Sequence, residues 1–363
     1  MQFDHKHYVP CLRWKQGEYQ AVHRFSNTVK ASFTPLIEVP EIGWDFEKRK
    51  ERKTIDEHLD PFAKRVANKW GKDPCFVDLH YIDPSERMQG GSHPVRFIFN
   101  ELRKENCFAV PSIYLDSNEK YKKEIKAILD EDKNRLCLRI SLKQTTEQTL
   151  KDDIDSIIGG LKIKLDKIHL ILDMDTPNFV PLDGFSKLLK TILSGLPYLN
   201  EWKTFSLLGT SFPETMGGIQ KGAALLPRCE WQLYKKIIKD FEREKLRVPT
   251  FGDYAIQHPN ILKLDMRLIN PSATIRYTTE DNWLIIKGKG TRVKDGFKQF
   301  RDLSKKLIST HYYCGSDFSY GDNYIEKCAH GKASTGTLMT WRQVGTNHHI
   351  QKVIKDISNY YVS

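Results

Sequence analysis

The chain has 363 residues, of which 57 are Lys or Arg and 46 are Asp or Glu, so its formal net charge is +11 at pH 7. Hydrophobic residues make up 39% and charged residues 28%, a composition that excludes an intrinsically disordered chain. The net charge is +9 over residues 231–363 and +2 over residues 1–230, so we expect any anionic partner to bind the last third.

The seven cysteines form no CxxC pair, and no stretch approaches 18 consecutive apolar residues. The odd number of cysteines argues against a disulfide framework, and their spacing argues against a finger-type zinc site. The first residues, MQFDHKHYVP, lack the apolar core of a secretory signal, and nothing is long enough to span a membrane. We therefore expect a cytoplasmic protein without a membrane partner.

Short apolar runs, bounded by Pro, Asp or Gly and rich in Val, Ile, Leu and Phe, recur along the first 210 residues. Such runs are typical of strands that are buried on both faces. The predicted strands are Tyr8–Leu12, Thr34–Val39, Cys75–His80, Phe108–Leu115, Leu136–Leu142, Ile168–Met174 and Phe205–Gly209.

Amphipathic helical patterns lie between these strands and make the sequence alternate between strand and helix. This alternation predicts a parallel α/β architecture. An eighth strand, either Val248–Tyr254 or Thr274–Thr278, would close a TIM-barrel-like (β/α)8 barrel over residues 1–260. The alternative is an open doubly wound sheet, which normally carries a Gly-rich phosphate turn after its first strand. The turn here, RWKQGEYQ, has one glycine, so the barrel is favoured. The predicted helices cover residues 54–70, 94–104, 119–129 and 146–158.

Residues 261–363 predict a basic α+β C-terminal subdomain packed on the barrel. The segment ATIRYTTEDNWLIIKGKG has the pattern of a β-hairpin that turns at Glu280–Asn282. A helix is expected over roughly 294–308, and a final helix through Ile350 and Ile357.

The stretch Lys287–Lys306 concentrates eight basic residues against two acidic ones. Such a stretch could bind a nucleic-acid backbone, with Phe297 and Phe300 stacking on bases. The alternative is that the two aromatic residues are the buried face of a helix whose lysines are merely solvated. The candidate nucleic-acid or phosphate contacts are Lys287, Lys289, Arg292, Lys294, Lys298 and Arg301.

Polar side chains stand where the predicted barrel strands end, which is the catalytic face of this fold. They are Lys15, Glu38, Asp78, His80, Asp116, Arg139, Asp173, Asp175 and Ser211. Glu38, Asp78 and Asp173 would bind Mg²⁺ or Mn²⁺, because hard cations take several oxygen ligands. Lys15 and Arg139 would then stabilise phosphate charge in a metal-dependent phosphodiesterase or nuclease. The alternative is that strand-end carboxylates only cap the helices that follow.

The segments YVPCLRWKQGEYQAV, TPLIEVPEIGW, LLGTSFPE, GDYAIQHP and TWRQVGTNHHIQKVI resemble the Beta protein family, over nearly the whole chain. The resemblance implies an anti-phage defence protein of a satellite-prophage cassette. Such a protein acts with a partner toxin, the killer protein encoded beside it, as a neutraliser or infection sensor. The resemblance implies no catalytic residues. Three functions therefore stay open: the defence protein, which is favoured, the metal-dependent enzyme, and a non-catalytic nucleic-acid-binding protein.

Overall fold

The computed structural model describes residues 2–133, 135–262, 265 and 267–362, which form two compact units. The two units alternate along the chain instead of meeting at one boundary. The first unit takes Met1–Trp14, Phe33–Thr210 and Glu230–Asp253. The second unit takes Lys15–Ser32, Ser211–Cys229 and Tyr254–Ser363, so two whole segments and the start of a third come from the first 260 residues.

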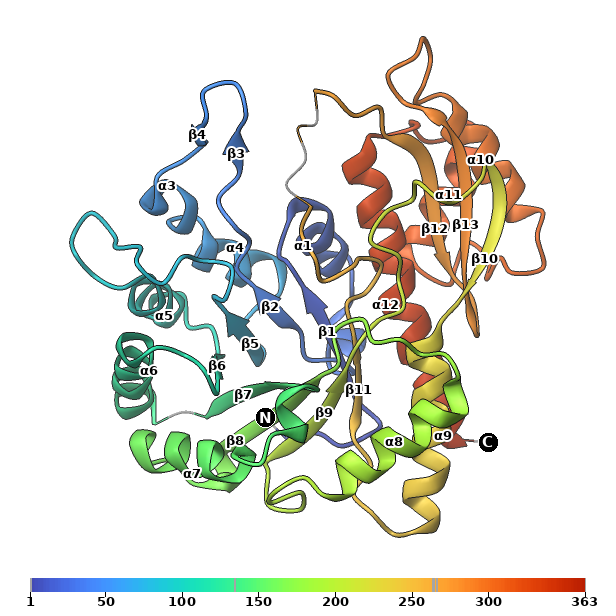
Figure 1. Ribbon diagram of the computed structural model, residues 1–363. Helices are drawn as coiled ribbons and strands as arrows, with labels where there is room; N and C mark the ends of the chain where they lie inside the picture. The colour runs from blue at the N-terminus through green and yellow to red at the C-terminus, as the bar shows by residue number, and fades with distance from the viewer. Residues whose placement is uncertain (1, 134, 263–264, 266, 363) are drawn as a thin grey trace. The chain divides into compact units, whose positions relative to one another are not determined.

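Eight strands of the first unit are parallel and close into a barrel within the described residues (Figure 1). Their order around the barrel is β1-β11-β9-β8-β7-β6-β5-β2. This closure confirms the predicted (β/α)8 barrel. The strands are β1 (Tyr8–Leu12), β2 (Leu36–Glu38), β5 (Cys75–Asp78), β6 (Ala109–Tyr114), β7 (Leu136–Ser141), β8 (Ile168–Asp173), β9 (Thr204–Leu208) and β11 (Thr250–Asp253).

The apolar runs reflect the burial of the barrel strands on both faces. Every residue of β1, β2, β5, β9 and β11 is buried, because one face fills the barrel interior and the other is covered by helices. Of the two candidates for the closing strand, the one around Val248–Tyr254 is correct, since β11 pairs with β9 and β1. The other candidate, Thr274–Thr278, belongs to the second unit.

Helices connect the barrel strands, and several begin at a capping residue that the sequence supplies. The predicted helix over residues 54–70 is two helices, because Pro61 interrupts it. Thr54 and Glu57 form a reciprocal capping box at the first of these, and the side chain of Asn118 accepts from the backbone N–H of Tyr121 at another. The helices are α3 (Ile55–Leu59), α4 (Phe62–Lys69), α5 (Pro94–Lys104), α6 (Glu119–Asp132), α7 (Leu150–Leu161), α8 (Leu182–Ser194) and α9 (Cys229–Arg243); a short hairpin, β3 (Trp44–Asp45) and β4 (Lys50–Glu51), follows β2.

The second unit contains an antiparallel sheet in the order β10-β13-β12 together with helices. The predicted hairpin is present as β12 (Ser272–Thr278) and β13 (Asn282–Gly290), and β10 (Gly222–Pro227) joins it from the other side. Phe300 stacks on Trp341 in the apolar core of the unit, with ring centroids 4.5 Å apart. The helices are α1 (Gln16–His23), α2 (Asn27–Lys30), α10 (Gln299–Ile308), α11 (Tyr320–Ala329) and α12 (Leu338–Val362).

Among the residues that the structure describes, no helix combines the length and the apolar character that crossing a membrane requires.

Candidate active site

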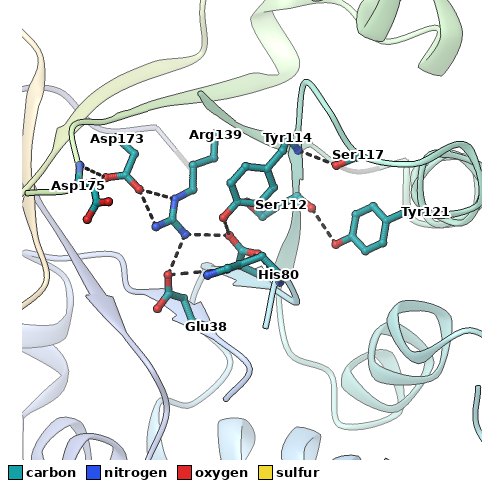
Figure 2. Close-up of polar contacts among 10 residues, drawn as sticks. Glu38, His80, Ser112, Tyr114, Ser117, Tyr121, Arg139, Asp173 and Asp175 are labelled. Atoms are coloured by element: carbon teal, nitrogen blue, oxygen red, sulfur yellow. Dashed lines mark hydrogen bonds and ion pairs between the residues drawn. The ribbon is translucent and has the colours of Figure 1, made fainter. Parts of the chain in front are cut away.

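Four of the predicted site residues meet at the carboxyl ends of the barrel strands (Figure 2). Glu38 ends β2, Asp78 ends β5 and Asp173 ends β8, while Arg139 lies two residues before the end of β7. Glu38 is 0%, Asp78 1% and Arg139 4% exposed. The barrel register brings them together, since Glu38 is paired with Asp78 across β2 and β5.

The guanidinium of Arg139 donates hydrogen bonds to all three carboxylates. Its Nη1 lies 2.8 Å from Oε1 of Glu38 and 3.0 Å from Oδ2 of Asp78. Its Nε and Nη2 lie 2.9 and 2.7 Å from Oδ2 of Asp173. The backbone of Asp175, at a positive φ of 56°, donates to the other oxygen of Asp173 at 2.8 Å.

This arrangement does not fit the predicted Mg²⁺ or Mn²⁺ ion, because the three carboxylates already converge on the cationic guanidinium. Within the described parts of the chain, no group of three or more His, Cys, Asp or Glu side chains is arranged to hold a metal ion. Bound in this way, Arg139 neutralises carboxylates instead of presenting its charge to a phosphate. Lys15 is the N-cap residue of α1 and belongs to the second unit.

His80 lies beside this cluster and is held by Asp78. Both its backbone N–H and its Nδ1 donate to Oδ1 of Asp78, at 2.9 and 3.2 Å, and Nδ1 lies 3.9 Å from Oε1 of Glu38. No described residue forms a hydrogen bond at its Nε2, and its side chain is 28% exposed. One ring nitrogen of His80 is therefore held by a carboxylate, and the other is available for a hydrogen bond to a ligand.

The carboxylates also set the pKa values at this site. Burial lowers the pKa of His80, but the charge of Asp78, the hydrogen bond to it and the charge of Glu38 raise it above the ordinary value of 6.5. Burial raises the pKa of Asp78, but His80, Arg139 and the hydroxyl of Tyr114 together hold it well below its usual range. The site thus favours an ionised Asp78 beside a protonated His80.

Two neighbouring side chains stay protonated at this site. The hydroxyl of Tyr114, at the end of β6, donates to Oδ2 of Asp78 at 2.7 Å. Burial raises its pKa well above the ordinary value, an effect that the charge of Arg139 opposes and that of Asp78 supports. Burial and the charge of Glu38 likewise raise the pKa of the Cys11 thiol, so Cys11 is not a candidate nucleophile.

A cavity of about 480 Å³ opens beside His80, Asp78 and Tyr114 within the first unit. Its described lining residues include the acidic side chains Asp78, Asp83 and Asp116 but no Lys or Arg. The full lining is Asp78, Leu79, His80, Ile82, Asp83, Pro84, His93, Pro94, Tyr114, Asp116, Ser117, Asn118 and Tyr121.

Tyr114, Tyr121 and His93 were not among the residues that the sequence identified. Tyr114 carried a readable signal, because it ends a predicted strand and shares a face with Ser112 at the two-residue spacing of a strand. The sequence gives no such signal for Tyr121 and His93. Tyr121 lies in helix α6 and His93 is the N-cap of helix α5, so neither stands at the end of a strand. The hydroxyl of Tyr121 reaches back 3.0 Å to the carbonyl of Ser112 (Figure 2).

The basic segment Lys287–Lys306 forms part of β13, the following turn and α10 in the second unit. Lys289, Lys294, Lys298 and Arg301 are exposed there, and Lys298 pairs with Asp295 at 2.9 Å.

Other members of this segment have contacts within the unit. Lys287 donates to the carbonyl oxygens of Met216 and Ile219 at 2.5 and 2.6 Å, and Arg292 donates to that of Arg267 at 2.6 Å. Phe300 is 0% exposed in the apolar core, and Phe297 packs against that core. These aromatic residues therefore form the buried face of the helix and do not stack on bases, while backbone contacts by the exposed basic residues stay a prediction.

The comparisons with known proteins identify a family. The model of the Beta protein family matches residues 8–355. No curated protein matches the sequence. Among solved structures, a mutant tryptophan synthase alpha-subunit from Pyrococcus furiosus is 11% identical, with a TM-score of 0.38, over 70% of this chain and 88% of that one. A putative lyase/mutase from Burkholderia cenocepacia J2315 is 14% identical, with a TM-score of 0.35, over 69% of this chain and 76% of that one.

Proposed function

The chain belongs to the Beta protein family, and we propose that the barrel of this member is an enzyme that performs acid–base chemistry on a small neutral or cationic molecule. The observation that carries this proposal is His80, whose Nδ1 is fixed by Asp78 while no described residue bonds its Nε2 at the edge of a cavity. A histidine oriented by a carboxylate is a common general acid–base group.

The charge of the site determines which substrates it favours. The cluster contains three carboxylates against one guanidinium and the imidazolium of His80, and two further acidic side chains, Asp83 and Asp116, line the cavity. Because like charges repel strongly where little water screens them, this site disfavours anions such as phosphodiesters. A neutral polyol or an amine fits better than the phosphate substrate of the metal-dependent alternative.

The chemistry follows from the geometry of His80. Neutral His80 takes a proton at Nε2 from a substrate group in the cavity, and ionised Asp78 stabilises the imidazolium that forms. Arg139 and Tyr114 hold Asp78 in place through its other oxygen, Oδ2. Because the pKa of His80 is raised, we expect the rate of a base-catalysed step to increase as the pH rises through a value above 6.5.

The test uses a small-molecule extract of bacterial cells that is incubated with the purified protein and followed by mass spectrometry. We expect the protein to consume a neutral or cationic compound in the presence of EDTA, and H80Q to slow this by about 10²–10⁴-fold. The matched control is H311Q, because His311 is an exposed histidine of the second unit. The proposal is wrong if turnover requires Mg²⁺ or Mn²⁺, or if H80Q leaves the turnover unchanged. The absence of any turnover would also contradict it.

We further propose that the protein acts in the cytoplasm as part of a prophage-borne anti-phage cassette. There it works with a partner toxin, either neutralising the toxin or sensing infection. Family membership supports this role. Deleting the gene should change phage plating or the toxicity of the neighbouring killer protein, and unchanged plating and toxicity would refute it. Complementation with H80Q then shows whether the acid–base site serves the defence role.

A further inference from the structure

A second cavity, of about 830 Å³, lies within the second unit, and its charge is opposite to that of the barrel site. It is lined by the loop at residues 215–221, by β12 and β13, and by the start of α12. The charged side chains among its described lining residues are Lys221, Arg276, Lys287 and Arg342, and none of these residues is acidic. Four cationic side chains around one cavity indicate a site for an anion.

Arg276 lacks the partner that a half-buried guanidinium needs. It lies on β12 beside the ring of Phe212, with 5.6 Å between the guanidinium carbon and the ring centroid. Its Nε is buried, and no described residue accepts a hydrogen bond from it. Burial, and then the charge of Arg342, lower the pKa of Arg276 well below its ordinary value. A desolvated cation beside a second cation is costly to fold, unless a bound anion compensates it.

The wall around Arg276 is held in place before any ligand binds. Lys287 fastens the loop through the carbonyl oxygens of Met216 and Ile219. Arg342 is anchored by a 3.1 Å hydrogen bond from its Nη1 to the carbonyl of Ile256. Lys221 is exposed at the end of the loop. Such preorganisation reduces the entropy that a ligand must overcome on binding.

We propose that this cavity binds a small phosphate-bearing molecule of nucleotide size, with Arg276 as its central phosphate contact and Arg342 and Lys221 beside it. Arginine suits phosphate because its planar fork can donate two hydrogen bonds to two phosphate oxygens. The cavity volume falls within the range of small-molecule sites, and Met216, Ile219 and Leu338 supply an apolar wall for the rest of the ligand. The volume of this cavity and its apolar wall favour a small molecule over a nucleic acid strand.

The test is isothermal titration calorimetry of the full chain with ATP, inorganic pyrophosphate and citrate. We expect ATP to bind with one site per chain and pyrophosphate more weakly, with citrate weaker than both. R276M should raise the Kd for ATP by at least about tenfold, the value of one or more charged hydrogen bonds. K221Q should raise it by a smaller factor. K305Q is the matched control, because Lys305 is exposed on α10 and does not line the cavity.

A thermal melt separates this role from a purely structural one. Without ligand, R276M should melt at a higher temperature than the wild type, because it removes a desolvated charge and keeps the apolar stem over Phe212. ATP should then raise the melting temperature of the wild type by more than that of R276M at the same concentration. Failure of ATP and pyrophosphate to bind, equal binding by R276M, stronger binding of citrate, or stronger binding of a short single-stranded oligonucleotide would each overturn the proposal.

Discussion

His80 couples the stability of the barrel to pH in a direction that its contacts determine. Its folded-state pKa is raised above 6.5, so its contribution is fully present below pH 6.5 and is lost as the pH rises through the folded-state pKa. We therefore expect the free energy of unfolding to fall across this window in the wild type, and to fall less in H80Q. Urea unfolding from about pH 6 to pH 9 measures the two slopes. H311Q should keep the wild-type slope, and equal slopes in the wild type and H80Q would contradict this view.

Asp78 gives the opposite dependence at acidic pH. Its folded-state pKa is lowered, so its contribution is present above the ordinary value of 3.8 and is lost as the pH falls through the folded-state pKa. The hydrogen-bonded pair of Asp78 and His80 therefore stabilises the barrel most between these two ordinary values, where both side chains are charged.

Arg139 should contribute more to stability than a partly exposed arginine with as many partners. Removing it leaves three carboxylates together in the barrel, so we expect R139M to cost about 3–5 kcal/mol at neutral pH. The cost should shrink at acidic pH, where the carboxylates can take up protons. R103M is the matched control, because Arg103, whose side chain is 34% exposed, pairs with Glu131, Asp132 and Asn100 and should lose less than Arg139, about 1 kcal/mol. Urea unfolding measures both variants, and equal losses would refute the central role of Arg139.

The strand-end rule predicted that the carboxylates gather, but it could not predict the ion that they surround. The position of Glu38, Asp78 and Asp173 follows from the strand order and register. The direction of the Arg139 side chain follows from packing inside the barrel, which no sequence spacing reports. The hydrogen bond between Asp78 and His80 was readable in principle, since it joins residues two positions apart.

At the scale of elements, the close approach of α1 to α12 depends on one glycine. A Cβ at Gly17 would lie 2.6 Å from Cγ of Arg342, so G17A must displace either helix α12 or the side chain of Arg342. We expect a loss of about 1–3 kcal/mol in a thermal or urea melt. G159A is the matched control, because Gly159 lies inside α7 with open space around it and should gain about 0.5–1 kcal/mol. A neutral or stabilising G17A would show that α12 adapts without cost.

Elements with a clear apolar pattern or turn were predictable, whereas a short strand without such a pattern was not. The strand β10 has alternating exposed and half-buried residues and pairs with a strand distant in sequence, so its run of GAALLP carries little local signal. The choice between Val248–Tyr254 and Thr274–Thr278 shows the same principle. β11 is fully buried as a barrel strand must be, whereas β12 alternates because one face of its sheet is partly open.

At the scale of the whole molecule, the two units differ in net charge more than residues 1–230 differ from residues 231–363. The second unit carries 21 basic and 11 acidic residues, a net charge of +10, which leaves +1 for the first unit. The structure therefore assigns nearly all of the positive charge to the unit that contains the basic cavity. The acid–base site lies in the nearly neutral unit and is itself acidic, so the two sites should select ligands of opposite charge.

This separation predicts where charge reversal weakens the binding of a polyanion. Replacing Lys289, Lys294 and Lys298 by Glu should weaken binding of a labelled DNA duplex and lower the slope of log K against log salt by about one for each phosphate that the variant no longer neutralises. The matched control reverses three exposed lysines of the barrel unit, Lys64, Lys120 and Lys133, with the same change in net charge. Fluorescence anisotropy over a salt series measures both triple variants. Salt screens charges that are more than about 10 Å from the bound phosphates, so lysines outside the binding surface contribute little. The barrel variant should therefore keep the wild-type slope. Equal effects of the two triple variants would show that duplex binding follows the total charge of the chain and not the basic segment.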